Sequence, residues 1–319
     1  MKITVALLSI ALCFLASPTH AGSPAHAGSP ARAGSPAHAG SPARAGSPAY
    51  AGSFRVTATI FPIADLVKKV GGDAVTVHTL LQPGRGPHSF EPTPGDARKI
   101  EQADMVVMAG FGIDIWLKKL VKLGGETDNE IVDCSKAVTN PVKGGNHDHR
   151  DGGVNPHYWL DPSIMADVAD MLGRLLASRI PDRADEIIKR TKRVKADLLK
   201  LDKEIKAMLG ETKAGFVSFH NSWVYFARRY GLKQVGVIEE APGREPSARR
   251  MVLLIKKIKS TGAKAVMVEP QFSARLGEAL AKETGVAVAV VDPIGGVEGR
   301  ADYFEMMRWN AKRFHTALK

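Results

Sequence analysis

Cysteine is almost absent from this chain of 319 residues, which limits how the fold can be stabilised. Only Cys13 and Cys134 occur, and Cys13 lies in an apolar stretch at the N-terminus. If that stretch is removed on export, one thiol remains and no internal disulfide can form. The packed core must therefore supply the stability, and sulfur contributes little to any metal site unless Cys134 lies in it.

Long apolar runs and aromatic residues are also scarce. No apolar run after the N-terminal stretch is long enough for a membrane helix. The few aromatic residues do not interleave with the basic residues that give the chain a net charge of +11. Those basic residues are scattered along predicted helices, as in Lys189–Arg193. This pattern favours solvated helix faces over a surface that binds nucleic acid.

Local motifs of catalysis are missing as well. The chain has no His-Glu-x-x-His zinc motif, no Gly-x-Ser-x-Gly nucleophile turn and no glycine-rich loop that would cradle phosphates. A catalytic zinc site also keeps one coordination position open for water and needs a nearby base. A secreted zinc hydrolase is therefore the weaker alternative to a binding protein.

The N-terminus carries the features of a secretory signal, which we assign to residues 1–21. Lys2 precedes the nearly all-apolar stretch Ile3–Ala16, which is too short to span a bilayer comfortably. Removal of the signal would release the protein into the periplasm. A lipid anchor at Cys13 is disfavoured, because Leu12 stands where a lipidation signal has a small residue.

A six-residue repeat, Ala-Gly-Ser-Pro-Ala-X, follows the signal. It runs in five copies from Ala21 through Tyr50, and X alternates between His and Arg before the final Tyr. Small residues with a proline in every repeat can build neither a core nor a helix. We therefore assign residues 22–53 to a flexible linker.

The rest of the chain alternates predicted strands and helices, which indicates parallel β-α-β units. The predicted helices include one near Ile113–Leu123, one at Pro162–Arg179 and a last one at Tyr303–Leu318. The alternation is interrupted by a helical run, Asp182–Leu209, which would be ~40 Å long. Its apolar residues share one face: Ile187, Val194, Leu198, Leu201, Ile205 and Met208. We predict an α/β fold of two lobes, each a mainly parallel sheet flanked by helices, joined by one long helix. The predicted limits are 54–181 for the first lobe, 182–209 for the linking helix and 210–319 for the second lobe.

Four metal-binding side chains lie beside short apolar runs: His88, His157, His220 and Asp292. Three imidazoles and a carboxylate are a complete ligand set for a divalent transition metal. The residues are too far apart for a local motif, so only the tertiary fold could bring them together. Ligands in open parallel sheets bind outside the carboxyl ends of strands, where three of the four are predicted to lie. Each residue alone has a simpler structural explanation, but the joint pattern favours a metal site.

Six segments together resemble the zinc/manganese substrate-binding proteins of bacterial ABC importers. They are GRGPHSFEPTPGD, NPHYWLDP, FHNSWVYFARRYGL, REPSARR, EPQFS and VVDPIGG, in that order from about Phe54 to the C-terminus. The resemblance implies one rigid helix joining two α/β lobes, with the metal held in the cleft between them. It places the four ligands at His88, His157, His220 and Asp292. It also implies delivery of the metal to a membrane permease by a monomeric protein.

The third ligand position bears on the identity of the metal. Relatives with histidine there, as at His220, resemble zinc binders, whereas many manganese binders have glutamate. Zinc accepts three imidazoles and a carboxylate, while manganese prefers more oxygen ligands. Zinc is therefore the expected metal, and manganese and iron stay as alternatives. A chelate-binding or adhesion protein with the same fold is a further alternative.

Three auxiliary residues follow from the same resemblance. Glu269 is expected near the cleft, where it would orient a ligand histidine; a loop or helix-capping carboxylate is the competing interpretation. His147 and His149 stand where zinc-binding relatives often carry a histidine-rich loop, and they could capture a second metal weakly. Many zinc-binding relatives also have a C-terminal disulfide, which this chain cannot form.

Overall fold

The computed structural model describes residues 53–123, 129–144, 153–240 and 243–319 of the chain. The predicted signal and most of the repeat linker lie outside these ranges. In the described part of the chain, no helix is both long and apolar enough to cross a membrane.

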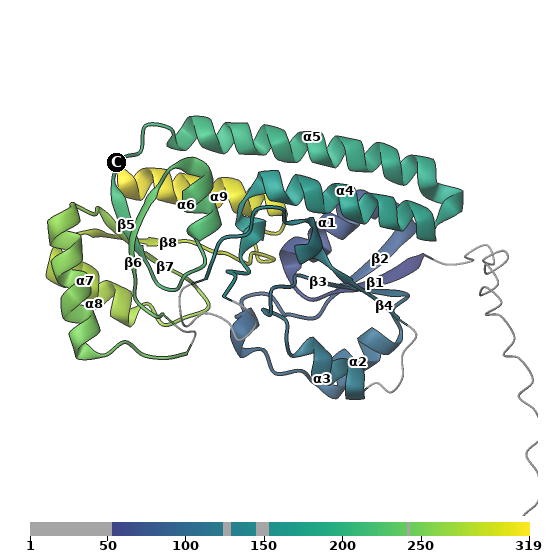
Figure 1. Ribbon diagram of the computed structural model, residues 1–319, viewed down its shortest axis with the longest axis horizontal. Helices are drawn as coiled ribbons and strands as arrows, with labels where there is room; N and C mark the ends of the chain where they lie inside the picture. Colours follow the sequence, from purple (N-terminus) through teal and green to yellow (C-terminus); the bar gives the residue numbers. More distant parts are fainter. Residues whose placement is uncertain (1–52, 124–128, 145–152, 241–242) are drawn as a thin grey trace, which may run out of the picture. The chain divides into compact units, whose positions relative to one another are not determined.

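The first lobe is built on a four-stranded parallel sheet with the strand order β2-β1-β3-β4. Figure 1 shows helices α1 and α4 on one side of this sheet and α2 and α3 on the other. The strands are β1 (Phe54–Ala58), β2 (Val75–Thr79), β3 (Met105–Met108) and β4 (Glu130–Asp133). The helices are α1 (Phe61–Gly71), α2 (Pro94–Glu101), α3 (Leu117–Leu123) and α4 (Pro162–Arg179).

The second lobe repeats this arrangement with the order β6-β5-β7-β8, again parallel throughout. Helices α7 and α8 cover one side, and α6 and α9 lie on the other (Figure 1). The strands are β5 (Gly215–Ser218), β6 (Lys233–Val237), β7 (Ala265–Val268) and β8 (Ala287–Val290). The helices are α6 (Val224–Tyr230), α7 (Ala248–Thr261), α8 (Arg275–Thr284) and α9 (Tyr303–Leu318).

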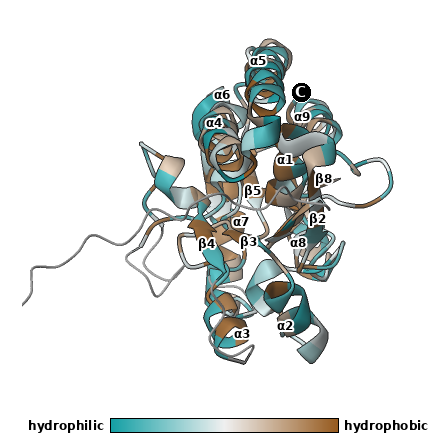
Figure 2. Ribbon diagram, turned by 90° about the vertical axis from the view of Figure 1, so that its right-hand side faces the viewer, coloured by the Kyte–Doolittle hydropathy of each residue, from teal (hydrophilic) through white to brown (hydrophobic). Residues whose placement is uncertain are grey.

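A single helix, α5 (Ala184–Leu209), joins the two lobes and is 26 residues long. It packs on α1 and α4 of the first lobe and on α9 of the second. Its buried face has the predicted helical period and consists of Ile187, Thr191, Val194, Leu198, Leu201, Asp202, Ile205 and Leu209. Figure 2 shows the complementary hydrophilic face of α5 in teal. The predicted fold class, two parallel α/β lobes joined by one long helix, is confirmed.

The starts of several helices follow from capping residues in the sequence. Thr93 and Asp96 form a capping box at the start of α2, as the sequence Thr-Pro-Gly-Asp predicts. Asp161 caps α4 by accepting a hydrogen bond from Ser163 N at 2.9 Å, and Pro162 occupies the first helical position. In the described ranges, short 3₁₀ turns lie between the longer elements at Gly72–Ala74, Pro87–Ser89, Cys134–Ala137, Tyr158–Leu160 and Pro181–Arg183.

The predicted helix near Ile113–Leu123 begins later than expected, at Leu117. The preceding segment Gly110–Gly112 has three consecutive positive φ angles of 88°, 50° and 79°, which a helix cannot include. The buried carboxylate of Asp114 holds this turn by accepting hydrogen bonds from Ala109 N at 2.6 Å and Gly110 N at 3.2 Å. Side-chain bonding to the backbone thus competes with helix formation here.

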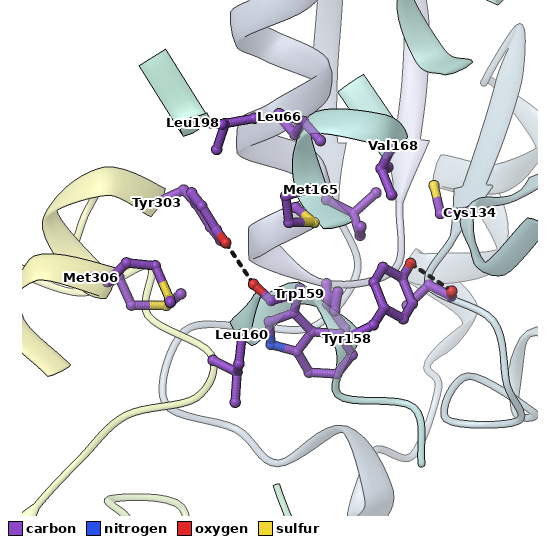
Figure 3. Packing of buried hydrophobic residues seen from close by; sticks show 14 of the residues in the cluster. Leu66, Cys134, Tyr158, Trp159, Leu160, Met165, Val168, Leu198, Tyr303 and Met306 are labelled. Atoms are coloured by element: carbon purple, nitrogen blue, oxygen red, sulfur yellow. Dashed lines mark hydrogen bonds between the residues drawn. The ribbon is translucent and has the colours of Figure 1, made fainter. Parts of the chain in front are cut away.

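The largest hydrophobic cluster extends through both lobes. It joins Val56 of β1 to Phe216 of β5 and Phe314 of α9. Figure 3 shows where hydrogen bonds cross it: the Tyr303 hydroxyl donates to Trp159 O at 2.6 Å, and the Tyr158 hydroxyl donates to Ala109 O at 2.7 Å. Because one core serves both sheets, the lobes are packed against each other over a shared apolar layer.

Candidate metal centre

Three histidines from separate loops meet between the two lobes. His88 lies in the 3₁₀ turn after β2, His157 immediately precedes the turn Tyr158–Leu160, and His220 follows β5. Nε2 of His157 is 3.4 Å from Nε2 of His88 and 3.2 Å from Nε2 of His220. The ligand atoms of all three lie within 4.8 Å of one another. His157 and His220 are buried, and His88 is half-buried.

These spacings fit a single tetrahedral metal ion. Two nitrogen ligands at ~2.0–2.1 Å from a tetrahedral zinc are about 3.4 Å apart. The Nε2–Nε2 distances of 3.2 and 3.4 Å in this site are close to that ligand-to-ligand distance. The three side chains therefore face a common point where one ion could lie.

The His157 ring is fixed by an amide. Its Nδ1 atom is 3.0 Å from Asn155 Oδ1, which also accepts the backbone N–H of His157 at 3.0 Å. Asn155 Nδ2 donates to Asn221 O at 2.6 Å, so the amide oxygen must face the imidazole. A proton on Nδ1 of His157 leaves the lone pair on Nε2, directed at the common point.

Glu269 lies against the His220 ring. Its Nδ1 atom is 2.7 Å from Oε2 of Glu269, which is 2% exposed. The other carboxylate oxygen, Oε1, accepts hydrogen bonds from Ser222 Oγ at 2.8 Å and Trp223 Nε1 at 3.1 Å. Glu269 thus lies where an orienting residue for His220 would lie. That role stays a prediction.

Asp292 lies two residues after β8 and is buried with four hydrogen-bond donors around its carboxylate. Oδ1 accepts hydrogen bonds from Gln271 Nε2 at 2.9 Å and from the N–H groups of Ile294 and Gly295 at 3.0 and 3.1 Å. Oδ2 accepts a hydrogen bond from Arg300 Nε at 2.8 Å. Asp292 does not belong to the cluster of ligand atoms formed by the three histidines. Its role as the fourth ligand stays a prediction.

Buried carboxylates gather at the carboxyl ends of the second sheet. Glu239 follows β6, Glu269 follows β7 and Asp292 follows β8, and all three are buried. Burial raises the pKa of Glu239 above its usual value, although the Gly243 N–H and nearby His220 partly oppose the rise. Buried carboxylates beside an imidazole cluster form a region that favours a cation.

Sequence reasoning missed several residues that support the site. Asn155 carried a weak signal, since it stands two residues before a candidate ligand in Asn-Pro-His. Arg300 carried none, because only the tertiary fold brings it to Asp292. His147 and His149 lie outside the described residues, so a second metal there stays a prediction.

Two α/β lobes joined by one helix, with imidazoles from both lobes around one point, define a metal-binding member of the solute-binding proteins. The chain belongs to the family described as zinc-uptake complex component A, periplasmic (ZnuA), whose pattern matches residues 56–317. This is a family of solute-binding proteins and not of enzymes, in agreement with the expectation from the sequence.

Curated relatives agree with this family. The zinc-binding protein AdcA of Streptococcus pyogenes serotype M6 is 30% identical over 282 residues, which are 80% of this chain and 54% of AdcA. The chain therefore spans about half the length of AdcA. The high-affinity zinc uptake system protein ZnuA of Bacillus subtilis is 26% identical over 278 residues, which are 82% of this chain and 87% of that protein.

Solved structures have the same fold. A zinc-bound deletion mutant of ZnuA matches with a TM-score of 0.75 and 30% identity, covering 84% of this chain and 98% of that one. The laminin-binding protein Lmb of Streptococcus agalactiae, described as having adhesin and metal-transporting activity, matches with a TM-score of 0.74 and 27% identity. That match covers 84% of this chain and all of Lmb.

Proposed function

We propose that the protein binds one zinc ion between its lobes, outside the cytoplasm, and delivers it to the membrane permease of an ABC importer. The proposed ligands are His88, His157, His220 and Asp292. The observation that carries this proposal is the convergence of three Nε2 atoms at 3.2 and 3.4 Å, close to the spacing around a tetrahedral zinc.

The protonation state expected at the site supports metal binding over a purely structural role. Nδ1 of His157 and Nδ1 of His220 each face an oxygen atom, at 3.0 and 2.7 Å. This arrangement leaves the Nε2 lone pairs on the inner side, where they face one another. Neighbouring lone pairs repel one another without a bridging proton or cation, and a metal ion removes that repulsion.

Metal content and one substitution test the proposal. Protein purified under zinc-replete conditions is expected to contain about one zinc per chain, and His220→Ala is expected to lose most of its zinc affinity. The matched control is His78→Ala, because His78 is exposed on β2 and outside the triad. Zinc-free wild-type protein, or His220→Ala with unchanged affinity, would contradict the proposal.

The identity of the metal has its own test. Three imidazoles favour zinc, whereas Mn²⁺ and Fe²⁺ prefer sites richer in oxygen. In a competition titration, a tenfold excess of Mn²⁺ or Fe²⁺ is expected to leave bound zinc in place. Displacement of zinc by either ion would assign the site to that ion.

Location and organisation complete the proposal. We propose that the mature chain is periplasmic, monomeric and free of a lipid anchor, with the repeat as a linker to lobes at 54–181 and 210–319 and with 182–209 as the helix between them. Cys13 lies outside the described residues. Fractionation of producing cells is expected to leave the protein in the soluble periplasmic fraction. Its retention in detergent-extracted membranes, abolished by Cys13→Ser, would assign an anchor instead.

A further inference from the structure

Arg300 lies against the carboxylate proposed as the fourth ligand. Its Nε atom donates to Oδ2 of Asp292 at 2.8 Å, and the Asp292 side chain is 2% exposed. The Arg300 guanidinium lies over the ring of Trp309, 4.4 Å from its centroid, and the arginine side chain is 20% exposed. One face of the guanidinium is thus held by an aromatic ring while its Nε atom neutralises a buried anion.

A tight turn fixes the backbone of Arg300. Its backbone N–H donates to Val297 O, and its carbonyl accepts the N–H of Gly296, both at 2.9 Å. Gly299, immediately before Arg300, has a φ of 73°, which favours glycine. The backbone is therefore held in place, so any withdrawal of Arg300 from Asp292 must come from its own side-chain rotations.

The hydrogen bonds of Asp292 divide unequally between its two oxygens. A carboxylate has about four lone-pair sites, and Oδ1 already accepts three hydrogen bonds. Among the described residues, Arg300 donates the hydrogen bond that Asp292 Oδ2 accepts. The lone pair of Asp292 that remains for a metal ion is therefore on Oδ2, next to the positive charge of the Arg300 guanidinium.

We infer that Arg300 is a positioning residue that holds Asp292 in the metal-free protein and competes with the incoming metal for Oδ2. This inference rests on the proposed function, because it requires Asp292 to be a ligand. Arg300 keeps the buried carboxylate neutralised while the site is empty, and it repels the dication when the site fills. The consequence is a weaker but more readily reversible site, as delivery to a permease requires.

Removal of the positive charge tests this directly. Arg300→Gln and Arg300→Met are both expected to bind zinc about tenfold more tightly, with correspondingly slower release to a chelator, because a nearby like charge is gone. Arg300→Met also keeps an unbranched side chain against Trp309, which guards against a loss of packing. Arg300→Lys retains the charge and is expected to bind zinc like the wild type. Arg308→Gln is the matched control, since Arg308 pairs with Glu204 on the exposed side of α9.

A second measurement does not depend on zinc affinity. Without zinc, Arg300→Gln and Arg300→Met are expected to melt at a lower temperature than wild type, because Asp292 is left buried without its counter-ion. Zinc is expected to restore most of the loss, so the zinc-induced rise in Tm exceeds that of wild type. A residue that merely stabilised the loop would lower Tm equally in both states.

The outcomes separate this inference from the proposed function. If His220→Ala binds zinc like wild type, the proposed function fails. If His220→Ala loses zinc while Arg300→Gln and Arg300→Met bind it with unchanged or weaker affinity, only the role of Arg300 is overturned. Tighter binding in both Arg300 variants, with Arg308→Gln unchanged, supports the competition.

Discussion

The indole N–H of Trp159 donates to the carbonyl of Pro293 at 2.7 Å. Trp159 stands two residues after the candidate ligand His157, and Pro293 directly follows Asp292. Both partners are buried, so the bond links the loops of the two lobes inside the protein. It fixes the separation of two candidate ligands through a rigid side chain and a proline.

Trp159→Phe is expected to lower the free energy of unfolding by about 1–3 kcal/mol, because it leaves a buried carbonyl without a donor. Chemical denaturation measures the loss. Trp116→Phe is the matched control, since the Trp116 indole N–H has no acceptor among the described residues. Equal losses in the two variants would show that ring volume, not the hydrogen bond between lobes, determines the effect.

Asn155→Ala is expected to weaken zinc binding by about 10- to 100-fold, because it removes the acceptor that orients His157 and the bond to Asn221 O. Isothermal titration with zinc measures the change. Asn129→Ala serves as the control, because Asn129 bonds to Ile100 O in the first lobe and contacts no candidate ligand. Wild-type zinc affinity in Asn155→Ala would show that the Asn155 amide does not support the metal site.

Glu269→Gln tests the protonation of His220 more sharply than truncation does. The Trp223 N–H and Ser222 O–H require an oxygen, so the amide NH₂ of glutamine must face His220 Nδ1. That forces the ring proton onto Nε2 and blocks the lone pair, with an expected loss of about 10- to 100-fold in zinc affinity. Glu278→Gln on α8 is the control. Equal zinc affinity in both variants is the result that would refute an orienting role.

Zinc affinity is expected to fall as pH drops below about 6.5, because imidazoles must lose a proton before they can coordinate a metal. With three imidazoles the decline should be steeper than for one titrating ligand. Titrations at pH 8, 7, 6 and 5 measure it, with circular dichroism as a check that the fold persists. Unchanged affinity at pH 5 would count against a three-histidine site.

The ion pair of Lys69 with Asp302 joins α1 to the start of α9. Burial opposes the charge of Asp302, but the hydrogen bond and charge of Lys69 prevail and lower the pKa of its carboxyl below 3.8. The pair therefore stabilises the fold above that value, and this stability is lost as pH falls through the lowered pKa.

Asp302→Asn keeps the helix cap, because an amide oxygen still accepts from Phe304 N and Glu305 N. It is expected to cost about 0.5–1 kcal/mol at pH 7 and progressively less as the pH falls through the lowered pKa of Asp302. Urea denaturation at a series of pH values measures the difference. Asp170→Asn, which breaks an exposed pair with Arg174, is the control. A cost that persists at low pH would assign the effect to something other than charge.

Local signals in the sequence predicted much of the fold. The bounds of α4 and α9 match the prediction, and the capping residue Asp161 is the local signal for the start of α4. The late start of α3 was missed, because it depends on the Asp114 carboxylate bonding to the backbone of Ala109 and Gly110. The spacing of apolar residues along the sequence does not show when a side chain bonds to the backbone in place of a helix.

The candidate site was predictable only in part. His88 and His220 follow strands of different sheets, and the rule that parallel strands place ligands at their carboxyl ends brought them together. Asn155 and Arg300 were not predicted, because what they bond depends on which loops face each other after folding. The sequence specifies the type of such side chains but not their neighbours.

The wide separation of the three histidines along the chain has a consequence for biogenesis. While the polypeptide is extended, as during passage through a translocation channel, His88, His157 and His220 are independent weak ligands. Only the folded chain, in which one core joins the two lobes, brings a ligand atom of each histidine within 4.8 Å of the others. Capture of a metal therefore reports that folding is complete, and an unfinished chain would not withdraw zinc from its surroundings.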